Sequence, residues 1–282
     1  MKKAKPPGLA GIIGYPLDHS LSPFIHNLSF AIRKLPYVFV KIEIPPARLA
    51  RTVGALADLG FIGANVTMPH KEAAARLVDT LSPEARAVGA VNTLVVNGGK
   101  IKGYNTDIDG FARSLEMLAR GRKFSTAAIF GAGGAAAAVG YALFHRFHTR
   151  NFHFICRNWR KAKKNLSQKP FFGKGFWADF VDWEDAERAV GASDLVVNAT
   201  PVGMDGKKTF PVSPAAFRYG QVAYDLIYDP PLTPFMRLAK KGGAQAVGGL
   251  EMLVQQAAVS FELWTGEKMP VEKVKKELLN TF

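Results

Sequence analysis

Apolar positions along the chain fall into short runs separated by longer stretches in which apolar and polar residues recur with helical spacing. In the first third, the runs at 9–14, 37–44 and 61–67 predict strands. The stretches at 22–34 and 46–60 predict helices, the second closed by a glycine. A small-residue helix is expected after Lys71, in the segment GANVTMPHKEAAARL.

The next segment carries the pattern of a hairpin. Residues 90–107, AVNTLVVNGGKIKGYNTD, contain two apolar runs that turn at Asn97-Gly98-Gly99. A helix at 110–120 follows. The break near Gly103 to Gly110 is an expected joint between two domains, because a new strand that ends in the glycine-rich GAGG begins soon afterwards.

A second alternating series follows that joint. Strands are expected at 126–134, 151–157, 193–200, 221–228 and 244–249, and helices at 135–146, 159–166, 250–266 and 270–280. Strands that alternate with helices indicate parallel sheets, so the predicted fold class is α/β.

Composition places the chain among cytoplasmic globular proteins. Its 282 residues are 48% apolar, and one cysteine, Cys156, excludes an intrachain disulfide. The basic start MKKAKPPG precedes too short an apolar run for a secretory signal. The uncharged segment 124–144 has the length of a membrane span, but it is mostly alanine and glycine, which favours a buried strand, a turn and a buried helix.

The net charge of +14 is concentrated in one region. No Asp or Glu occurs between Met117 and Ala178, whereas twelve Lys and Arg fall there. Such a region attracts nucleic acid, an anionic membrane or a phosphorylated small molecule, and charge alone does not choose among them.

A glycine fingerprint favours the small molecule. Gly131, Gly133 and Ala136 have G-x-G-x-x-A spacing between an expected strand and an expected helix, the arrangement that binds a dinucleotide pyrophosphate. The following strand ends in CRNWRK, where NAD-specific sites usually carry an acid. Arg157 and Lys161 instead suit the 2′-phosphate of NADP, although a solvated basic helix start would explain them as well.

Polar clusters stand at the ends of other strands: YPLDHSLSPFIHN, NVTMPHK, AVNT, GYNTD and, far along the chain, GGLEMLVQQAA. Each has an ordinary structural explanation. Ser22 before Pro23 suits a helix N-cap, Asn92 a turn, Asp107 or Asp109 a helix cap, Gln256 an exposed helix face and Tyr228 a core position.

In this order, together with NATPVGM and YDLIYDP, the motifs resemble those of the shikimate dehydrogenase family from Gly14 to about Gly266. The resemblance implies a two-domain α/β fold. A substrate-binding domain of residues 1–107 and 245–282, completed by the C-terminal helices, is expected beside a Rossmann-type NADP-binding domain of residues 108–244. The implied reaction is the reversible NADPH-dependent reduction of 3-dehydroshikimate to shikimate.

The resemblance also implies residue roles. Lys71 and Asp107 match the catalytic pair. Substrate-binding positions are Ser20, Ser22, Thr67, Asn92, Asp107, Tyr228 and Gln256. Cofactor-binding positions are Gly131, Ala132, Gly133, Gly134, Ala135, Arg157, Asn158, Lys161, Leu226 and Gly249. No metal site is expected. Cys156-Arg157-Asn158 departs from the Asn-Arg-Thr common in the family, and His70 is expected to be a helix-start residue rather than the base.

Two roles remain open for Lys71: a proton donor and acceptor, or a cation that stabilises developing negative charge. The resemblance implies a monomer or homodimer. Its expected partner is a small-molecule substrate, and it is expected to bind neither nucleic acid nor a membrane. Quinate/shikimate and aminoshikimate-type dehydrogenases are alternatives within the enzyme class. A basic NADPH-sensing or nucleic-acid-binding protein is the alternative outside it.

Overall fold

The computed structural model describes residues 8–119, 121–173 and 175–280. Its contacts divide the chain into two compact units, Met1–Asp109 with Val254–Phe282, and Gly110–Leu253. Both changes of unit fall inside helices, α5 (Asp107–Ala119) and α10 (Leu250–Thr265). The basic N-terminal segment and two of the expected cations, Arg120 and Lys174, lie outside the described residues.

The first unit is built on a mixed sheet with the strand order β2-β1-β3-β5-β6-β4. Strands β1, β2 and β3 are parallel, and β5 runs antiparallel to β3 and β6. The strands are β1 (Gly8–Gly14), β2 (Tyr37–Glu43), β3 (Phe61–Val66), β4 (Thr80–Leu81), β5 (Thr93–Asn97) and β6 (Lys100–Tyr104). The helices are α1 (Ser22–Arg33), α2 (Leu49–Ala55), α3 (Lys71–Ala74), α4 (Pro83–Val88) and α11 (Val271–Leu279), with a 3₁₀ turn at Pro46–Arg48.

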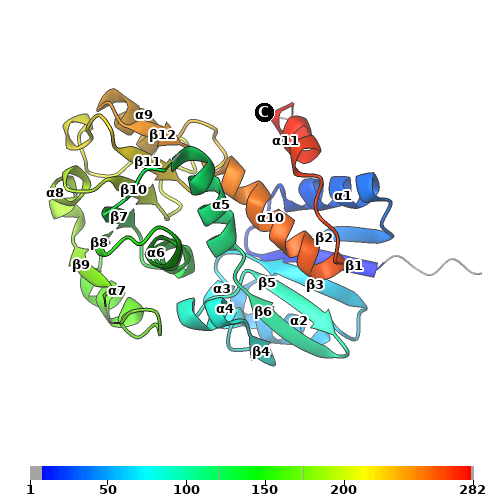
Figure 1. Ribbon diagram of the computed structural model, residues 1–282. Coiled ribbons are helices and arrows are strands. Elements are labelled where there is room, and N and C mark those ends of the chain that lie inside the picture. Colours follow the sequence, from blue (N-terminus) through cyan, green and yellow to red (C-terminus); the bar gives the residue numbers. More distant parts are fainter. Residues whose placement is uncertain (1–7, 120, 174, 281–282) are drawn as a thin grey trace, which may run out of the picture. The chain divides into compact units, whose positions relative to one another are not determined.

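The apolar runs of β1, β3 and β5 form the centre of this unit. Ile13, Ala64, Val66 and Leu94 are buried there with residues of α2 and α4. Figure 1 shows α10 lying along the same sheet, and the Trp264 indole donates a hydrogen bond to the Leu94 carbonyl at 2.9 Å. Strand and helix patterns therefore bury one continuous apolar layer.

The predicted hairpin is confirmed, and one predicted helix is too long. β5 and β6 pair through the two-residue turn Gly98-Gly99, where both residues have positive φ. The stretch 46–60 forms the 3₁₀ turn and α2, which ends at Ala55. Strand β4 and helix α4 were not expected, because their patterns are only two and six residues long.

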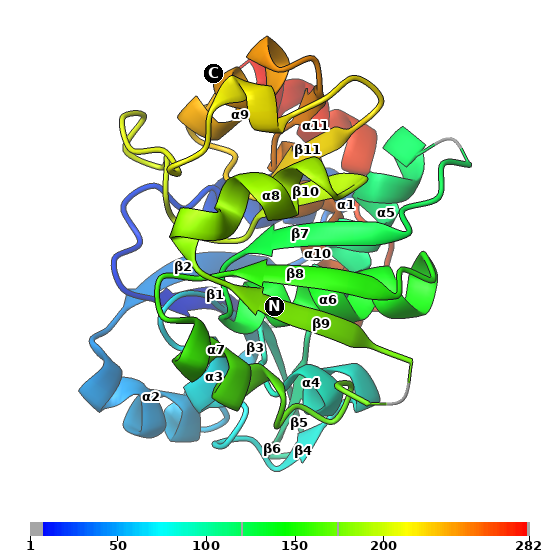
Figure 2. The same ribbon diagram turned by 90° about the vertical axis from the view of Figure 1, so that its left-hand side faces the viewer.

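The second unit contains six parallel strands in the order β12-β11-β10-β7-β8-β9, and Figure 2 shows β7, β8 and β9 side by side. This is the doubly wound order of dinucleotide-binding folds. The strands are β7 (Thr126–Phe130), β8 (Asn151–Ile155), β9 (Trp177–Val181), β10 (Leu195–Asn198), β11 (Val222–Asp225) and β12 (Gln245–Val247). The helices are α6 (Gly134–Arg146), α7 (Trp159–Leu166), α8 (Ala186–Gly191) and α9 (Pro234–Lys241), with 3₁₀ turns at Trp183–Asp185 and Pro214–Ala216.

The uncharged segment 124–144 is explained by this sheet. It forms β7, a turn and most of α6, and residues of both elements are fully buried in the unit. Over the described ranges, no helix has both the length and the apolar character that crossing a membrane requires.

The second unit extends further toward the C-terminus than the expected cofactor-binding domain. β12 pairs with β11, so residues 245–247 belong to the second sheet, whereas a limit at 244/245 would assign them to the substrate-binding domain. The contacts place the change of unit at Leu253/Val254.

Candidate functional site

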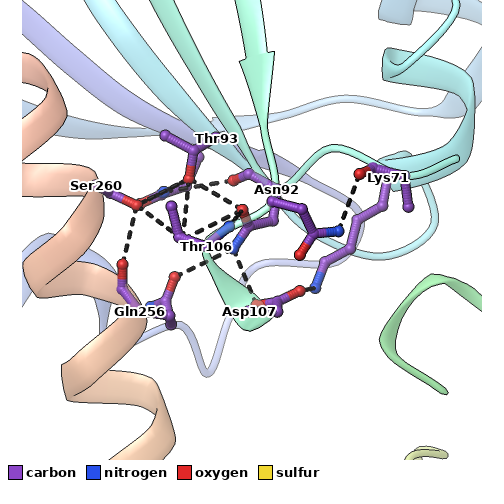
Figure 3. Close-up of polar contacts among 10 residues, drawn as sticks. Lys71, Asn92, Thr93, Thr106, Asp107, Gln256 and Ser260 are labelled. Carbon is purple, nitrogen blue, oxygen red and sulfur yellow. Dashed lines mark hydrogen bonds and ion pairs between the residues drawn. The ribbon is translucent and has the colours of Figure 1, made fainter. Parts of the chain in front are cut away.

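Lys71 and Asp107 form an ion pair in the first unit. Lys71 is the first residue of the short helix α3, and Asp107 is the first residue of α5. The Lys71 Nζ lies 2.6 Å from Asp107 Oδ2, and the two side chains are 21% and 8% exposed. This places a cation at an accessible position over a mostly buried carboxylate (Figure 3). The expected pairing of Lys71 with Asp107 is therefore a direct contact in the structure.

Asn92 holds the other oxygen of that carboxylate. It lies just before β5, is 3% exposed, and its Nδ2 donates to Asp107 Oδ1 and to Thr106 Oγ1, each at 2.9 Å. A longer bond of 3.4 Å reaches Gln256 Oε1 on α10. Gln256 is buried, so the exposed-face explanation is wrong for it, whereas Asn92 lies at a bend and is also buried. The structure brings together Lys71, Asn92, Asp107 and Gln256.

Behind Asn92 lies a group of buried polar side chains that the sequence did not single out. Thr93, Thr106 and Ser260 are at most 1% exposed, and Asn65 is 4% exposed. Their hydroxyl and amide groups bond to one another and to Asn92 (Figure 3). Their sequence signal is weak, because hydroxyl residues within a strand or a helix are common.

His70 has a structural role, as expected. It immediately precedes α3, is 1% exposed, and its Nε2 lies 2.9 Å from the Ile44 carbonyl oxygen. The His70 ring is therefore buried against a backbone carbonyl, whereas the Lys71 side chain is partly exposed.

The serines after β1 are close neighbours, but the capping prediction for Ser22 is wrong. Helix α1 begins at Ser22 itself, with Leu21 at the N-cap position in a helical conformation and no side-chain capping bond. The Ser22 N–H instead points to Ser20 Oγ at 3.4 Å. Thr67 follows β3, and its N–H bonds to the Ile13 carbonyl of β1. All three residues thus follow the carboxyl ends of adjacent parallel strands.

The turn between β7 and α6 has the geometry of a phosphate-binding loop. Gly131 has a φ of +110°, and an added Cβ would lie 2.9 Å from Thr200 Cγ2. At Gly133 an added Cβ would meet nothing within 4 Å, and α6 begins at the next residue. Ala132 and Ala135 lie half-buried beside it, and Ala136 is fully buried against the sheet. The first N–H groups of α6 suit an anion.

The basic residues after β8 are exposed. Arg157 and Lys161 lie in solvent, and the Arg157 guanidinium lies 5.4 Å from the centre of the Trp183 ring. Asn158 Oδ1 caps α7 by accepting from the Lys161 N–H at 3.0 Å. Cys156 is buried, which raises the pKa of its thiol to about 11 and keeps it neutral.

The remaining predicted residues of the second unit follow β11 and β12. The Gly249 N–H donates to the Ile227 carbonyl at 3.0 Å, which places Gly249 beside the Leu226–Ile227 backbone. Tyr228 is half-buried in this unit rather than a core residue.

A buried carboxylate holds the Leu226 turn, and the sequence assigned it no role. Asp225 accepts from Asn198 Nδ2, from the Ile227 N–H and from Thr233 Oγ1. Burial raises the pKa of Asp225 to about 6, and these bonds limit the rise. The motif NATPVGM supplies Asn198, and YDLIYDP supplies Asp225 and Ile227, so the two motifs are in direct contact.

No cluster of three His, Cys, Asp or Glu side chains suited to a metal ion occurs among residues 8–119, 121–173 and 175–280. The polar groups around Lys71 are amides, hydroxyls, one carboxylate and one ammonium.

Two family models match this chain, one near its start and one near its end. A family model for the shikimate dehydrogenase substrate binding domain matches residues 12–94, and one for the shikimate 5′-dehydrogenase C-terminal domain matches residues 249–279. The NADP(+) shikimate dehydrogenase of Methanopyrus kandleri is 41% identical, over 96% of this chain and 94% of its own.

Two solved structures are similar to this chain over nearly its whole length. Shikimate 5-dehydrogenase of Thermus thermophilus, in complex with NADP(H) and shikimate, has a TM-score of 0.84 and 32% identity, covering 98% of this chain and all of its own. Quinate dehydrogenase of Corynebacterium glutamicum, in complex with NAD, has a TM-score of 0.86 and 29% identity, covering 97% and 99%.

Proposed function

Since the chain belongs to the shikimate dehydrogenase family, we propose that it catalyses the reversible NADPH-dependent reduction of 3-dehydroshikimate to shikimate. It is an oxidoreductase that acts on a CH–OH group, with NADP as the cofactor. The observation that carries the proposal is the Lys71–Asp107 ion pair, held by Asn92 and Gln256 within one polar site.

The first unit is the proposed substrate-binding domain. Lys71, Asp107, Asn92 and Gln256 present an ammonium and amides that suit the hydroxyls of a polyhydroxylated ring. Ser20 and Ser22 are the proposed ligands of the substrate carboxylate, and the absence of a capping bond leaves the Ser22 side chain available for this role. Thr67 of this unit is a further proposed substrate-binding residue, and Tyr228 is the one proposed from the second unit.

The second unit is the proposed NADP-binding domain, and its residues fit that cofactor. The space above Gly133 and the N-terminus of α6 suit the pyrophosphate, which would be held by residues 131–135. Arg157 and Lys161 are exposed cations beside Asn158 and suit the 2′-phosphate. Leu226 and Gly249 are the proposed neighbours of the nicotinamide. When bound, NADPH supplies the hydride for the reduction.

Within this reaction, Lys71 handles the proton. Reduction of the carbonyl places negative charge on an oxygen, and a Lys71 ammonium within hydrogen-bond reach donates a proton to it. Asp107 orients that ammonium through the 2.6 Å bond. Asn92 fixes the carboxylate in turn, so the pair keeps its geometry before the substrate arrives.

Quinate dehydrogenase activity is the second candidate, because the chain resembles that enzyme across 97% of its length. The basic residues after β8 favour NADP over NAD, since no acid is present there to bind the ribose hydroxyls. We further propose a cytoplasmic monomer or homodimer that binds neither nucleic acid nor membranes, with Arg157 and Lys161 serving the cofactor phosphate.

The test is the reduction of NADP⁺ by the purified chain with shikimate or quinate, compared with the reduction of NAD⁺. The proposal predicts the highest kcat/KM for shikimate with NADP⁺. A higher kcat/KM for quinate with NAD⁺ would support the second candidate, and no turnover with either acid would refute both.

A further inference from the structure

Four buried polar side chains lie behind Asn92. Asn65, Thr93, Thr106 and Ser260 come from β3, β5, the segment before α5 and α10, and all are at least nine-tenths buried. None of them was assigned a role in binding or catalysis. Buried hydroxyls and amides are rarely left without hydrogen bonds, and here the side chains bond mainly to one another and to Asn92, whereas Asn65 Oδ1 has no partner.

The orientation of the Asn92 carboxamide is fixed by the Thr106 backbone and reinforced by the side chains of this group. The Thr106 backbone N–H lies 2.7 Å from Asn92 Oδ1, and a backbone N–H can only donate. The oxygen of the amide must therefore face Thr106, which turns Nδ2 toward Asp107. Thr93 Oγ1 donates to the same Oδ1 at 3.1 Å and secures the orientation from the other side.

The donors then run in one direction. Asn65 Nδ2 donates to Thr93 Oγ1 at 3.2 Å, and Thr93 passes its single proton to Asn92 Oδ1. Asn92 Nδ2 donates to Asp107 Oδ1, and Lys71 donates to Asp107 Oδ2. Successive donations in a water-poor interior polarise one another, so each bond strengthens the next and the chain ends on the carboxylate.

Ser260 closes the chain from α10. Its Oγ lies 2.8 Å from Thr93 Oγ1 and 3.1 Å from Thr106 Oγ1, and it accepts from Asn65 Nδ2 at 3.1 Å. Because Thr93 gives its single proton to Asn92, the 2.8 Å contact uses the proton of Ser260, and the Gln256 carbonyl, 3.1 Å away and one turn earlier in α10, is the other acceptor within reach of that proton. Ser260 therefore links the strand that carries Thr93 to the helix that carries Gln256.

We propose that Asn65, Thr93 and Ser260 are positioning residues, which orient the Asn92 carboxamide so that it holds Asp107 as the acceptor of Lys71 (Figure 3). They act through Asn92 and do not touch the reacting atoms. The kinetic part of this inference rests on the proposed function, whereas the orientation of the amide does not.

The kinetic test compares Thr93→Val, which removes the hydroxyl but keeps the shape, with Thr93→Ser, which keeps the hydroxyl. Thr93→Val is expected to lower kcat with shikimate and NADP⁺ about tenfold, to move the acid limb of the pH–kcat profile to higher pH, and to leave the KM for NADP⁺ unchanged. Thr93→Ser is expected to recover kcat to within about twofold.

Ser260→Ala is expected to lower kcat by a smaller factor, about threefold, because Ser260 lies one bond further from Asn92. Its matched control is Ser29→Ala, since Ser29 is equally buried and bonds only to the Ile25 carbonyl of its own helix. If Thr93→Val does not fold, the comparison of Ser260→Ala with Ser29→Ala is the deciding one. A normal kcat and pH profile in the network variants, or equal losses in the Ser29 control, would overturn the proposal.

An NMR measurement separates this inference from the proposed function. In the free protein, the Asn92 side-chain NH₂ is expected to exchange slowly with solvent in the wild type and in Thr93→Ser, and at least tenfold faster in Thr93→Val. Unchanged exchange in Thr93→Val would overturn the inference. An enzyme inactive toward shikimate, but with the expected exchange pattern, would refute the proposed function alone.

Discussion

The burial of His26 predicts how the unfolding free energy of the first unit depends on pH. Its ring is fully buried in the first unit, stacked on Phe39 at 4.5 Å between centroids and tilted against Trp264 at 5.0 Å. Neither ring nitrogen has a partner in hydrogen-bonding geometry. Burial lowers the pKa of His26 from 6.5 to about 3, and the neighbouring Asn65 side chain opposes this only in part.

The sign of the effect follows from proton binding. Between pH 6.5 and about 3 the unfolded chain binds a proton at His26 that the folded chain does not. The stabilisation from the neutral ring is therefore complete above pH 6.5 and is lost as the pH falls toward 3. At about 1.36 kcal/mol per pK unit, the loss between pH 7.5 and pH 5 amounts to roughly 2 kcal/mol.

The assay needs a reporter in the first unit. Trp264 is the only one of the four tryptophans in that unit, so its fluorescence reports there once Trp159, Trp177 and Trp183 are changed to Phe. Urea unfolding is measured at pH 7.5 and pH 5 in this background, with and without His26→Leu. The difference in unfolding free energy between the two pH values should be about 2 kcal/mol smaller in the variant. His19→Leu, at an exposed position, is the control, and an equal pH dependence with and without His26 would refute the reasoning.

Three further predictions concern the cofactor. Arg157→Ala should raise the KM for NADPH about tenfold and leave the KM for shikimate unchanged, whereas equal effects on both would contradict the 2′-phosphate assignment. Trp183→Leu removes the ring beneath the Arg157 guanidinium and should raise the KM for NADPH severalfold without affecting that for NADH; a parallel rise for NADH would argue for a general disturbance. Gly133→Ala should weaken NADPH binding severalfold, as measured by calorimetry, and leave the melting temperature of the free protein unchanged. Gly131→Ala should lower the unfolding free energy of the free protein by about 1–3 kcal/mol. Unaltered NADPH affinity in Gly133→Ala would place the pyrophosphate elsewhere.

Elements with strong periodicity could be predicted from the sequence. Helix α7 occupies the expected residues 159–166, and the hairpin turns at Gly98-Gly99 as its glycines indicate. Strand β9 and helix α8 were missed because β9 forms an edge of the sheet with few buried residues and α8 is only six residues long. A pattern with little burial leaves little periodicity to detect.

In the candidate site, contacts between recognisable motifs could be predicted, whereas contacts between residues without a local pattern could not. The pairing of Lys71 with Asp107 was expected from motif order and is a contact in the structure. Thr93 and Ser260 lie 167 positions apart in the chain, and neither has a local pattern that distinguishes it from an ordinary buried hydroxyl. Ser22 was misjudged because Leu21 continues the helical conformation, so the cap that a Ser-Pro pair usually makes does not form.

We propose that Lys71 is the proton donor of an NADP-dependent shikimate dehydrogenase. The decisive measurement of this role is kcat at saturating shikimate and NADP⁺. Lys71→Ala should lower kcat by at least 10²-fold with a much smaller change in KM. Lys71→Arg, which keeps the charge but holds its proton at neutral pH, should be nearly as impaired. Near-normal turnover in Lys71→Ala would remove Lys71 from the mechanism, and near-normal turnover in Lys71→Arg alone would show that it acts as a fixed charge.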